Sequence, residues 1–188
     1  YPLPGLAVTP DELAWVLECL LPYFEVRTVS EGVASLRGDR NRRPLLSFSF
    51  DDGQWDNLEF AAPVLERFGV LATFYVPTDN VGTERLLWHD RAAFAFAGKE
   101  ARSLAGRMLN DEAVTAGSSK AFMRRLKEVE PALRAEVVDA TARVAPAPPH
   151  WARLLDWSEV RRLVALGHEI GSHACSHQLL PQLPEAEQ

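Results

Sequence analysis

Cysteine is scarce in this sequence, and long apolar segments are missing. The 188 residues include only two cysteines, Cys19 and Cys175, too few for the several disulfides that hold small secreted domains together. No apolar run approaches the roughly 20 residues of a membrane-spanning helix. The first residues also lack the basic and then apolar order of a signal peptide. The compartment is therefore cytoplasmic or, if a leader has been removed, periplasmic or secreted.

Positive charge is also in short supply. Lysine and arginine number 20 against 26 acidic residues, so the net charge is -6 and no broad basic surface can attract phosphate backbones. Nucleic acid is therefore not expected as a partner. With 47% hydrophobic and 24% charged residues, the chain can bury one substantial core, and one domain is the default. Composition favours no particular oligomeric state.

The order of apolar segments predicts an α/β fold. Thr9 and Glu12 form a predicted capping box around a helix that starts at Pro10. Apolar runs, alternating or continuous, predict strands at residues 24–29, 44–50, 70–76 and 168–171. Strands that alternate with helices in this way imply parallel pairing.

Two further helices complete this pattern. Asp56 is expected to cap a helix that Gly69 ends. Near the C-terminus, a second predicted helix has a buried stripe of Val160, Leu163 and Val164. It is expected to begin with a capping pair, Asp156 and Glu159, and to end at Gly167.

A helical insertion is expected at about residues 84–153. Far more residues separate Pro77 from Leu154 than the dozen or so that one parallel crossover needs. Two segments in this range combine helix-forming residues with apolar positions three and four apart, "ERLLWHDRAAFAFAG" and "SSKAFMRRLKEVEPALRAEVVDATARV".

Two short motifs carry residues suited to chemistry. Asp51 and Asp52 follow one predicted strand in "SFDDG", and His173 and His177 follow another in "HEIGSHACSH". Each motif alone is weak, because Asp-Gly pairs are common in turns and two histidines four apart can be unrelated surface residues. However, α/β folds bind ligands at the carboxyl ends of parallel strands, so we expect the two motifs to converge.

One carboxylate and two imidazoles make a three-ligand metal site that keeps positions open for water and substrate. Zinc is the expected ion, with cobalt or manganese as alternatives. Such an ion activates water and polarises a carbonyl oxygen, which are the two requirements of amide hydrolysis. Neighbouring side chains at a strand end diverge, so one aspartate can bind the metal while the other faces the substrate as general base.

The motifs "SFSFDDG" and "GHEIGSHACSH", in this order, resemble those of the polysaccharide deacetylase family, also called NodB-homology domains or carbohydrate esterase family 4. The resemblance implies that Asp51 is the catalytic base and that Asp52, His173 and His177 are the metal ligands. It implies a metal-dependent hydrolase of linear amides that removes N-acetyl groups from an amino-sugar polysaccharide. That substrate would belong to bacterial envelope or exopolysaccharide metabolism.

The resemblance also implies a distorted (β/α) barrel with fewer or less regular strands than the usual eight. Residues 1–188 resemble its N-terminal portion, since the family's later motifs have no counterpart in this sequence. Those motifs supply an arginine that orients the base and a histidine that acts as general acid. The remaining histidines, His89, His150 and His168, are expected to be structural or surface residues. Ala174 stands where the family usually has serine or threonine.

Two other functions fit the same residues. The protein could be a non-catalytic homologue that binds carbohydrate or serves as a scaffold. It could also remove the acyl group from a small N-acyl sugar instead of an N-acetylated polysaccharide or oligosaccharide.

Overall fold

The chain folds as two units, which we call the α/β unit and the helical unit. The computed structural model describes residues 7–36 and 43–187. The α/β unit comprises Val8–Arg85 and Trp151–Ser176, and the helical unit consists mainly of Leu86–His150 and residues 177–187. Within the described ranges, each helix is too short or too polar to cross a membrane.

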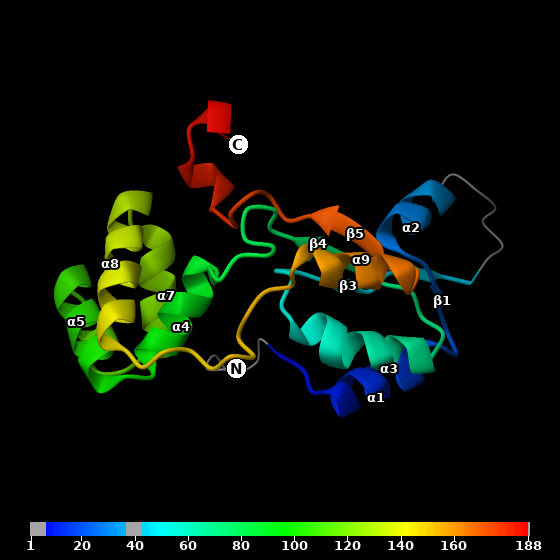
Figure 1. Cartoon of the computed structure of the whole chain (residues 1–188), viewed down its shortest axis with the longest axis horizontal. Helices are drawn as coiled ribbons and strands as arrows, with labels where there is room; N and C mark the ends of the chain where they lie inside the picture. Colours follow the sequence, from blue (N-terminus) through cyan, green and yellow to red (C-terminus); the bar gives the residue numbers. More distant parts are fainter. Residues whose placement is uncertain (1–6, 37–42, 188) are drawn as a thin grey trace. The chain divides into compact units, whose positions relative to one another are not determined.

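The α/β unit is built on parallel strands (Figure 1). Strands β1 and β2 pair with each other, and β4 lies between β3 and β5 in a three-stranded parallel sheet. The predicted parallel α/β class is therefore confirmed. In chain order the elements are α1 (Pro10–Leu20), β1 (Glu25–Val26), α2 (Val29–Ser35), β2 (Leu45–Leu46), β3 (Ser49–Phe50), η1 (Asn57–Ala61), α3 (Ala62–Arg67), β4 (Thr73–Val76), α9 (Trp157–Ala165) and β5 (Glu169–Ser172).

The register of the sheet brings three strand ends to one edge. Phe50 of β3 pairs with Phe74 of β4, and Val76 at the end of β4 pairs with Ser172 at the end of β5. Because the strands are parallel, the residues that follow β3 and β5 leave the sheet at the same edge, on either side of β4.

The capping boxes predicted at Thr9 and Asp156 are present, whereas the prediction that Asp56 caps its helix is wrong, because its backbone is already helical and its side chain makes no capping hydrogen bond. The backbone N–H of Glu12 donates to Thr9 Oγ1 at 3.2 Å, and Thr9 N–H donates to the Glu12 carboxylate at 2.7 Å. In the same way Asp156 accepts from Glu159 N–H at 2.8 Å, while Asp156 N–H donates back to Glu159 at 2.9 Å. These bonds satisfy N–H groups that the first helical turn leaves without partners.

The strand predicted at residues 44–50 is divided between two sheets. Leu45–Leu46 pairs with β1, whereas Ser49–Phe50 pairs with β4. The backbone N–H of Thr73 already donates to the Phe48 carbonyl at 3.0 Å, so the segment changes partner between Leu46 and Phe48. Sequence pattern shows the extended backbone but not the choice of partner.

The helix predicted after Asp56 begins with a π-helical turn. Element η1 runs from Asn57 to Ala61, and Ala62 N–H donates to the Asn57 carbonyl. The α-helix α3 follows, with Pro63 in its first turn. Because proline has no N–H, it cannot extend a regular α-helical hydrogen-bond ladder back into the preceding turn.

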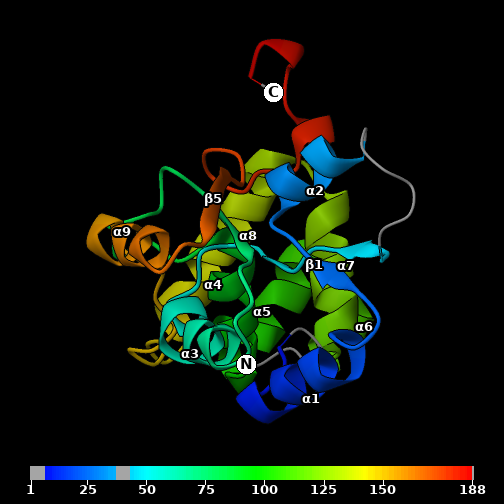
Figure 2. The same ribbon diagram turned by 90° about the vertical axis from the view of Figure 1, so that its right-hand side faces the viewer.

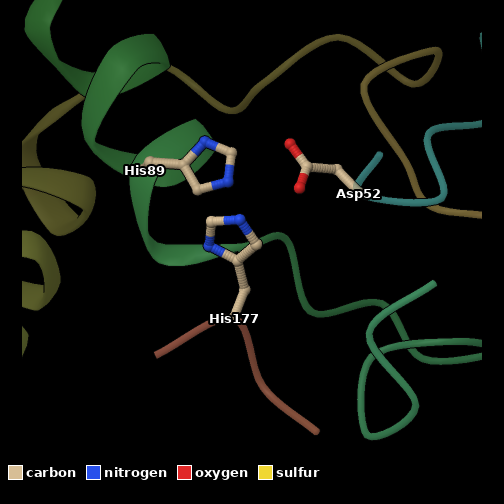
Figure 3. A group of neighbouring side chains, drawn as sticks. All are labelled: Asp52, His89 and His177. Carbon is tan, nitrogen blue, oxygen red and sulfur yellow. The ribbon is translucent and has the colours of Figure 1, made fainter. Parts of the chain in front are cut away.

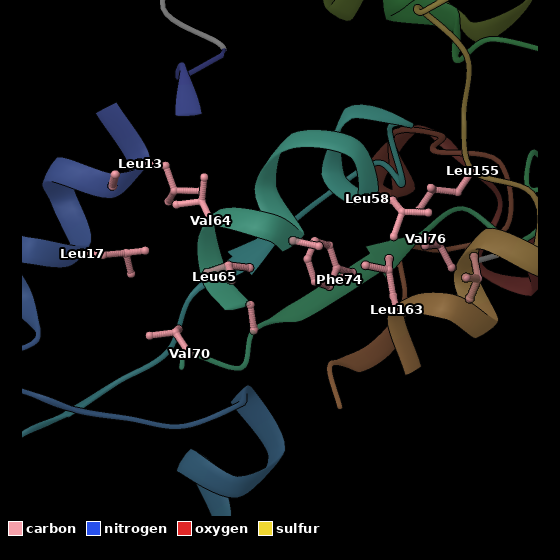
Figure 4. Packing of buried hydrophobic residues seen from close by; sticks show 14 of the residues in the cluster. Leu13, Leu17, Leu58, Val64, Leu65, Val70, Phe74, Val76, Leu155 and Leu163 are labelled. Atoms are coloured by element: carbon pink, nitrogen blue, oxygen red, sulfur yellow. The ribbon is translucent and has the colours of Figure 1, made fainter. Parts of the chain in front are cut away.

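The core of the α/β unit lies between its helices and the sheet. Leu17 of α1, Leu65 of α3, Phe74 of β4 and Leu163 of α9 are fully buried and belong to one apolar cluster (Figure 4). The predicted buried stripe of α9 is correct for Val160 and Leu163 but wrong for Val164, which is 54% exposed. The helix therefore presents a narrower apolar face to the sheet than the spacing indicated.

The helical unit has a separate core, to which α4, α5, α6, α7 and α8 contribute. Figure 2 shows the ribbons of these helices gathered together. The rings of Phe96 and Phe122 stack at 4.7 Å, and Val137 is fully buried beside them. A Cβ at Gly106 would overlap Thr115, so this glycine permits the close packing of α5 on α6. The elements are α4 (Trp88–Phe96), α5 (Lys99–Leu109), α6 (Glu112–Thr115), α7 (Ser119–Glu128), α8 (Pro131–Val144), η2 (Leu180–Gln182) and η3 (Glu185–Glu187).

Candidate active site

The first motif forms a sharp turn directly after β3. Asp51 is exposed, and the next two residues, Asp52 and Gly53, both have left-handed backbone, with φ of 72° and 60°. A Cβ at Gly53 would lie 3.0 Å from Cγ1 of Val76, so both the dihedral angle and the space require glycine. The turn therefore packs directly on the end of β4 and separates the two aspartates.

Backbone hydrogen bonds hold this turn on the segment that leads into α9. Leu155 N–H donates to the Gly53 carbonyl at 2.8 Å, and Trp55 N–H donates to the Arg153 carbonyl at 3.0 Å. Arg153 in turn makes a bidentate ion pair with Glu159, at 2.6 and 2.7 Å. This hydrogen-bonded pair lowers the pKa of Glu159 and raises that of Arg153.

The second motif continues the ladder of β4 and β5 beyond the sheet. His173 N–H donates to the Val76 carbonyl at 2.8 Å. Thr78 and Asp79 then donate to the carbonyls of Ala174 and Cys175, at 3.2 and 2.9 Å. Ala174 has a positive φ of 57°, so the chain turns immediately after His173. These backbone bonds fix the direction in which His173 leaves the sheet.

The two motifs meet in the α/β unit at Asp52 and His173. The Oδ1 atom of Asp52 lies 3.4 Å from Nε2 of His173, and both side chains are partly buried. Two ligand atoms at about 2.1 Å from a tetrahedral zinc ion are about 3.4 Å apart. The pair therefore has both the chemistry and the spacing of two ligands of one ion, although a direct ion pair has similar spacing.

His177 belongs to the helical unit, where the start of α4 holds it. The indole N–H of Trp88 donates to the His177 carbonyl at 3.0 Å. The His89 ring lies beside the His177 ring, with centroids 4.6 Å apart and planes tilted by 50° (Figure 3). His89 was expected to be a structural or surface residue. The signal that could have pointed to it is "WHD", a histidine beside an acid at the start of a predicted helix.

The other two histidines differ from each other in burial. His168 is buried, its Nδ1 accepts from Ala72 N–H at 3.2 Å, and its ring packs against Phe74. Burial lowers the pKa of His168, which favours the neutral ring. It is thus a core residue, in agreement with the prediction. His150 is exposed, and the thiols of Cys19 and Cys175 are exposed and free.

Residues 38–188 match the polysaccharide deacetylase family, and the chain belongs to that family. Two solved structures share its fold at low sequence identity. IcaB from Ammonifex degensii is 16% identical with a TM-score of 0.50, and the match covers 92% of this chain and 48% of that one. The Streptococcus pyogenes deacetylase PplD, solved in complex with acetate, is 14% identical with a TM-score of 0.52, covering 97% and 52%.

The chain thus spans about half the length of these two solved structures. Its parallel sheet is consistent with part of a NodB-type barrel, as the resemblance implied. No curated protein gives a significant sequence match.

Proposed function

We propose that this protein is a metal-dependent hydrolase that removes N-acetyl groups from an amino-sugar polysaccharide. The observation that carries the proposal is the approach of Asp52 to His173 at the carboxyl edge of a parallel sheet. Membership of the polysaccharide deacetylase family supports this class of reaction and of substrate. A bacterial envelope or exopolysaccharide polymer is the substrate we expect.

The proposed ligands are Asp52, His173 and His177, and the expected ion is zinc, with cobalt or manganese as alternatives. The spacing of Asp52 and His173 supports the first two ligands. His177 follows His173 by four residues, so the short turn at residues 174–176 ties the third ligand to the second. When bound, such an ion polarises the acetamide carbonyl and makes water more acidic.

Asp51 is the proposed general base. It follows β3 directly and is exposed, while the left-handed backbone at Asp52 sends the next carboxylate in another direction. Asp51 would accept the proton from the water that attacks the acetamide carbon. The C–N bond then breaks, acetate leaves, and the sugar nitrogen takes up a proton to become the free amine.

Acetate release from an N-acetylglucosamine pentamer tests the proposal. The wild-type protein with zinc or cobalt restored should release acetate, and Asp51→Asn should not. If wild type and Asp51→Asn are equally inert on N-acetylated oligosaccharides, the deacetylase function is wrong. Binding of the pentamer without turnover, unaffected by Asp51→Asn, would indicate a carbohydrate-binding homologue. Faster turnover of the monomeric N-acetyl sugar would indicate a small-sugar deacylase.

A further inference from the structure

We infer that His89 and His177, which lie side by side within the helical unit, bind the same metal ion, so that His89 is an additional ligand of the ion that His177 holds. This inference rests on the proposed metal site and deepens it. The residues that carry it all lie in the helical unit: His89, Asp90, Trp88, Arg134 and His177.

The relative placement of the two rings suits a shared ion. Their centroids are 4.6 Å apart and their planes are tilted by 50°. Figure 3 shows the two rings next to each other. Two imidazoles that bind one tetrahedral ion, each through a nitrogen at about 2.1 Å, have centroids about 5 Å apart. Aromatic rings without an ion also meet at such distances, either stacked or edge to face, so the metal titrations below distinguish a shared ion from a ring contact.

Asp90 orients the His89 ring. Its Oδ1 lies 3.4 Å from Nδ1 of His89, and the Asp90 side chain is 1% exposed. A carboxylate at Nδ1 favours the tautomer with its proton there, which leaves the Nε2 lone pair for a metal. The same negative charge offsets the positive end of the α4 dipole, which would otherwise oppose a cation next to the first turn of that helix.

A buried arginine holds the His177 segment against the same helix. Arg134 as a residue is 2% exposed. Its guanidinium lies 5.0 Å from the Trp88 ring centroid and donates to the side-chain oxygens of Gln182 and Gln178 at 2.5 and 3.1 Å. Trp88 then donates to the His177 carbonyl. The two imidazoles are therefore held by packed residues of α4 and α8, as a preorganised ligand pair requires.

His89 would add one imidazole donor to the proposed ligands and would strengthen the binding of the ion.

The replacement His89→Phe tests the inference, because phenylalanine keeps an aromatic ring but has no donor nitrogen. X-ray absorption of the zinc-loaded protein should count three imidazoles in wild type and two in the variant. Competition with a chromogenic chelator should show zinc affinity reduced at least about tenfold in His89→Phe. The exposed control, His150→Phe, should match wild type in both measurements. Equal imidazole counts and equal zinc affinity in wild type and His89→Phe would overturn the inference.

A second measurement needs no substitution and so does not depend on the folding of a variant. Zinc added to the wild-type protein should shift the ¹⁵N resonance of His89 Nε2 as it shifts that of the coordinating nitrogen of His177. A His89 resonance that does not respond would overturn the inference even where His177 does respond.

The outcomes also separate this inference from the proposed function. If His89→Phe changes nothing while the pentamer is deacetylated, the inference fails and the function stands. If zinc binds three imidazoles but the protein releases no acetate, the inference about His89 is supported and the proposed deacetylase function is wrong.

Discussion

Nε2 of His173 lies 3.4 Å from Oδ1 of Asp52, although the two residues are far apart in the sequence. They meet because β3 and β5 flank β4 in one parallel sheet and both end at the same edge. At this separation the pair can share an ion or form a direct ion pair, and metal binding distinguishes the two arrangements.

The replacement Asp52→Asn removes one proposed ligand charge with little change in shape. We expect zinc affinity to fall at least about tenfold, because an amide is a much weaker zinc ligand than a carboxylate. Isothermal titration with zinc measures this, and Asp79→Asn, an exposed aspartate in the adjoining loop, is the control. Identical affinities for wild type and Asp52→Asn would mean that Asp52 pairs with His173 for structure alone.

The replacement Asp51→Asn separates catalysis from metal binding. Loss of a general base typically slows turnover by about 10² to 10⁴-fold, whereas zinc affinity should stay close to that of wild type. Acetate assays and zinc titrations on the same preparation give both values. A variant that loses zinc as well would show that Asp51, and not Asp52 alone, binds the ion.

The replacement Gly53→Ala should destabilise the turn that carries both aspartates. The positive φ alone costs alanine about 1 kcal/mol, and the approach to Val76 should add about 1 kcal/mol or more. Gly69→Ala is the matched control, since Gly69 also has a positive φ of 63° but a Cβ there meets nothing within 4 Å.

Urea denaturation of both variants, and of Gly53→Ala combined with Val76→Ala, measures their unfolding free energies. The comparison separates the cost of the contact with Val76 from the cost of the positive φ. Equal losses of unfolding free energy for Gly53→Ala and Gly69→Ala would contradict the proposed packing of the turn on β4.

Glu169 should make the stability of the α/β unit depend on acid pH. Hydrogen bonds from Ser30 and Thr73 lower the pKa of Glu169 below its ordinary value of 4.5. The stabilisation is therefore complete above that value and is lost as pH falls through the lower folded pKa. Glu169→Gln should flatten this loss in urea titrations between pH 7 and 3, compared with the exposed control Glu18→Gln. If the stability of Glu169→Gln depends on pH as that of wild type does, Glu169 is not the source of the acid sensitivity.

Local features of the fold were predictable from the sequence, whereas features that depend on distant partners were not. The capping boxes at Thr9 and Asp156 form within four residues, so residue type and spacing indicate them. The same spacing at Asp56 gives no side-chain cap, because the helix there begins with a π-helical turn. By contrast, the segment at residues 44–50 divides between two sheets because β1 and β4 compete for its backbone. No pattern within seven residues encodes that choice.

In the candidate site, too, one pairing was predictable from the sequence and another was not. The rule that parallel strands end at one edge predicts that Asp52 and His173 lie close together, and their side chains are 3.4 Å apart. Their role as metal ligands with His177 stays a prediction. The pairing of His89 with His177 depends on how α4 folds within the insertion, where Trp88 and Arg134 fix the geometry. Sequence spacing carries no signal for such a contact, since the two histidines share neither a helix nor a strand.

A crystal structure of the zinc-soaked protein, with anomalous data collected at the zinc edge, tests the proposed metal site most directly. We expect one anomalous peak about 2.0 to 2.2 Å from a carboxylate oxygen of Asp52 and from an imidazole nitrogen of both His173 and His177. A protein whose Asp52 and His173 contact each other directly, with zinc absent or bound elsewhere, would contradict the account.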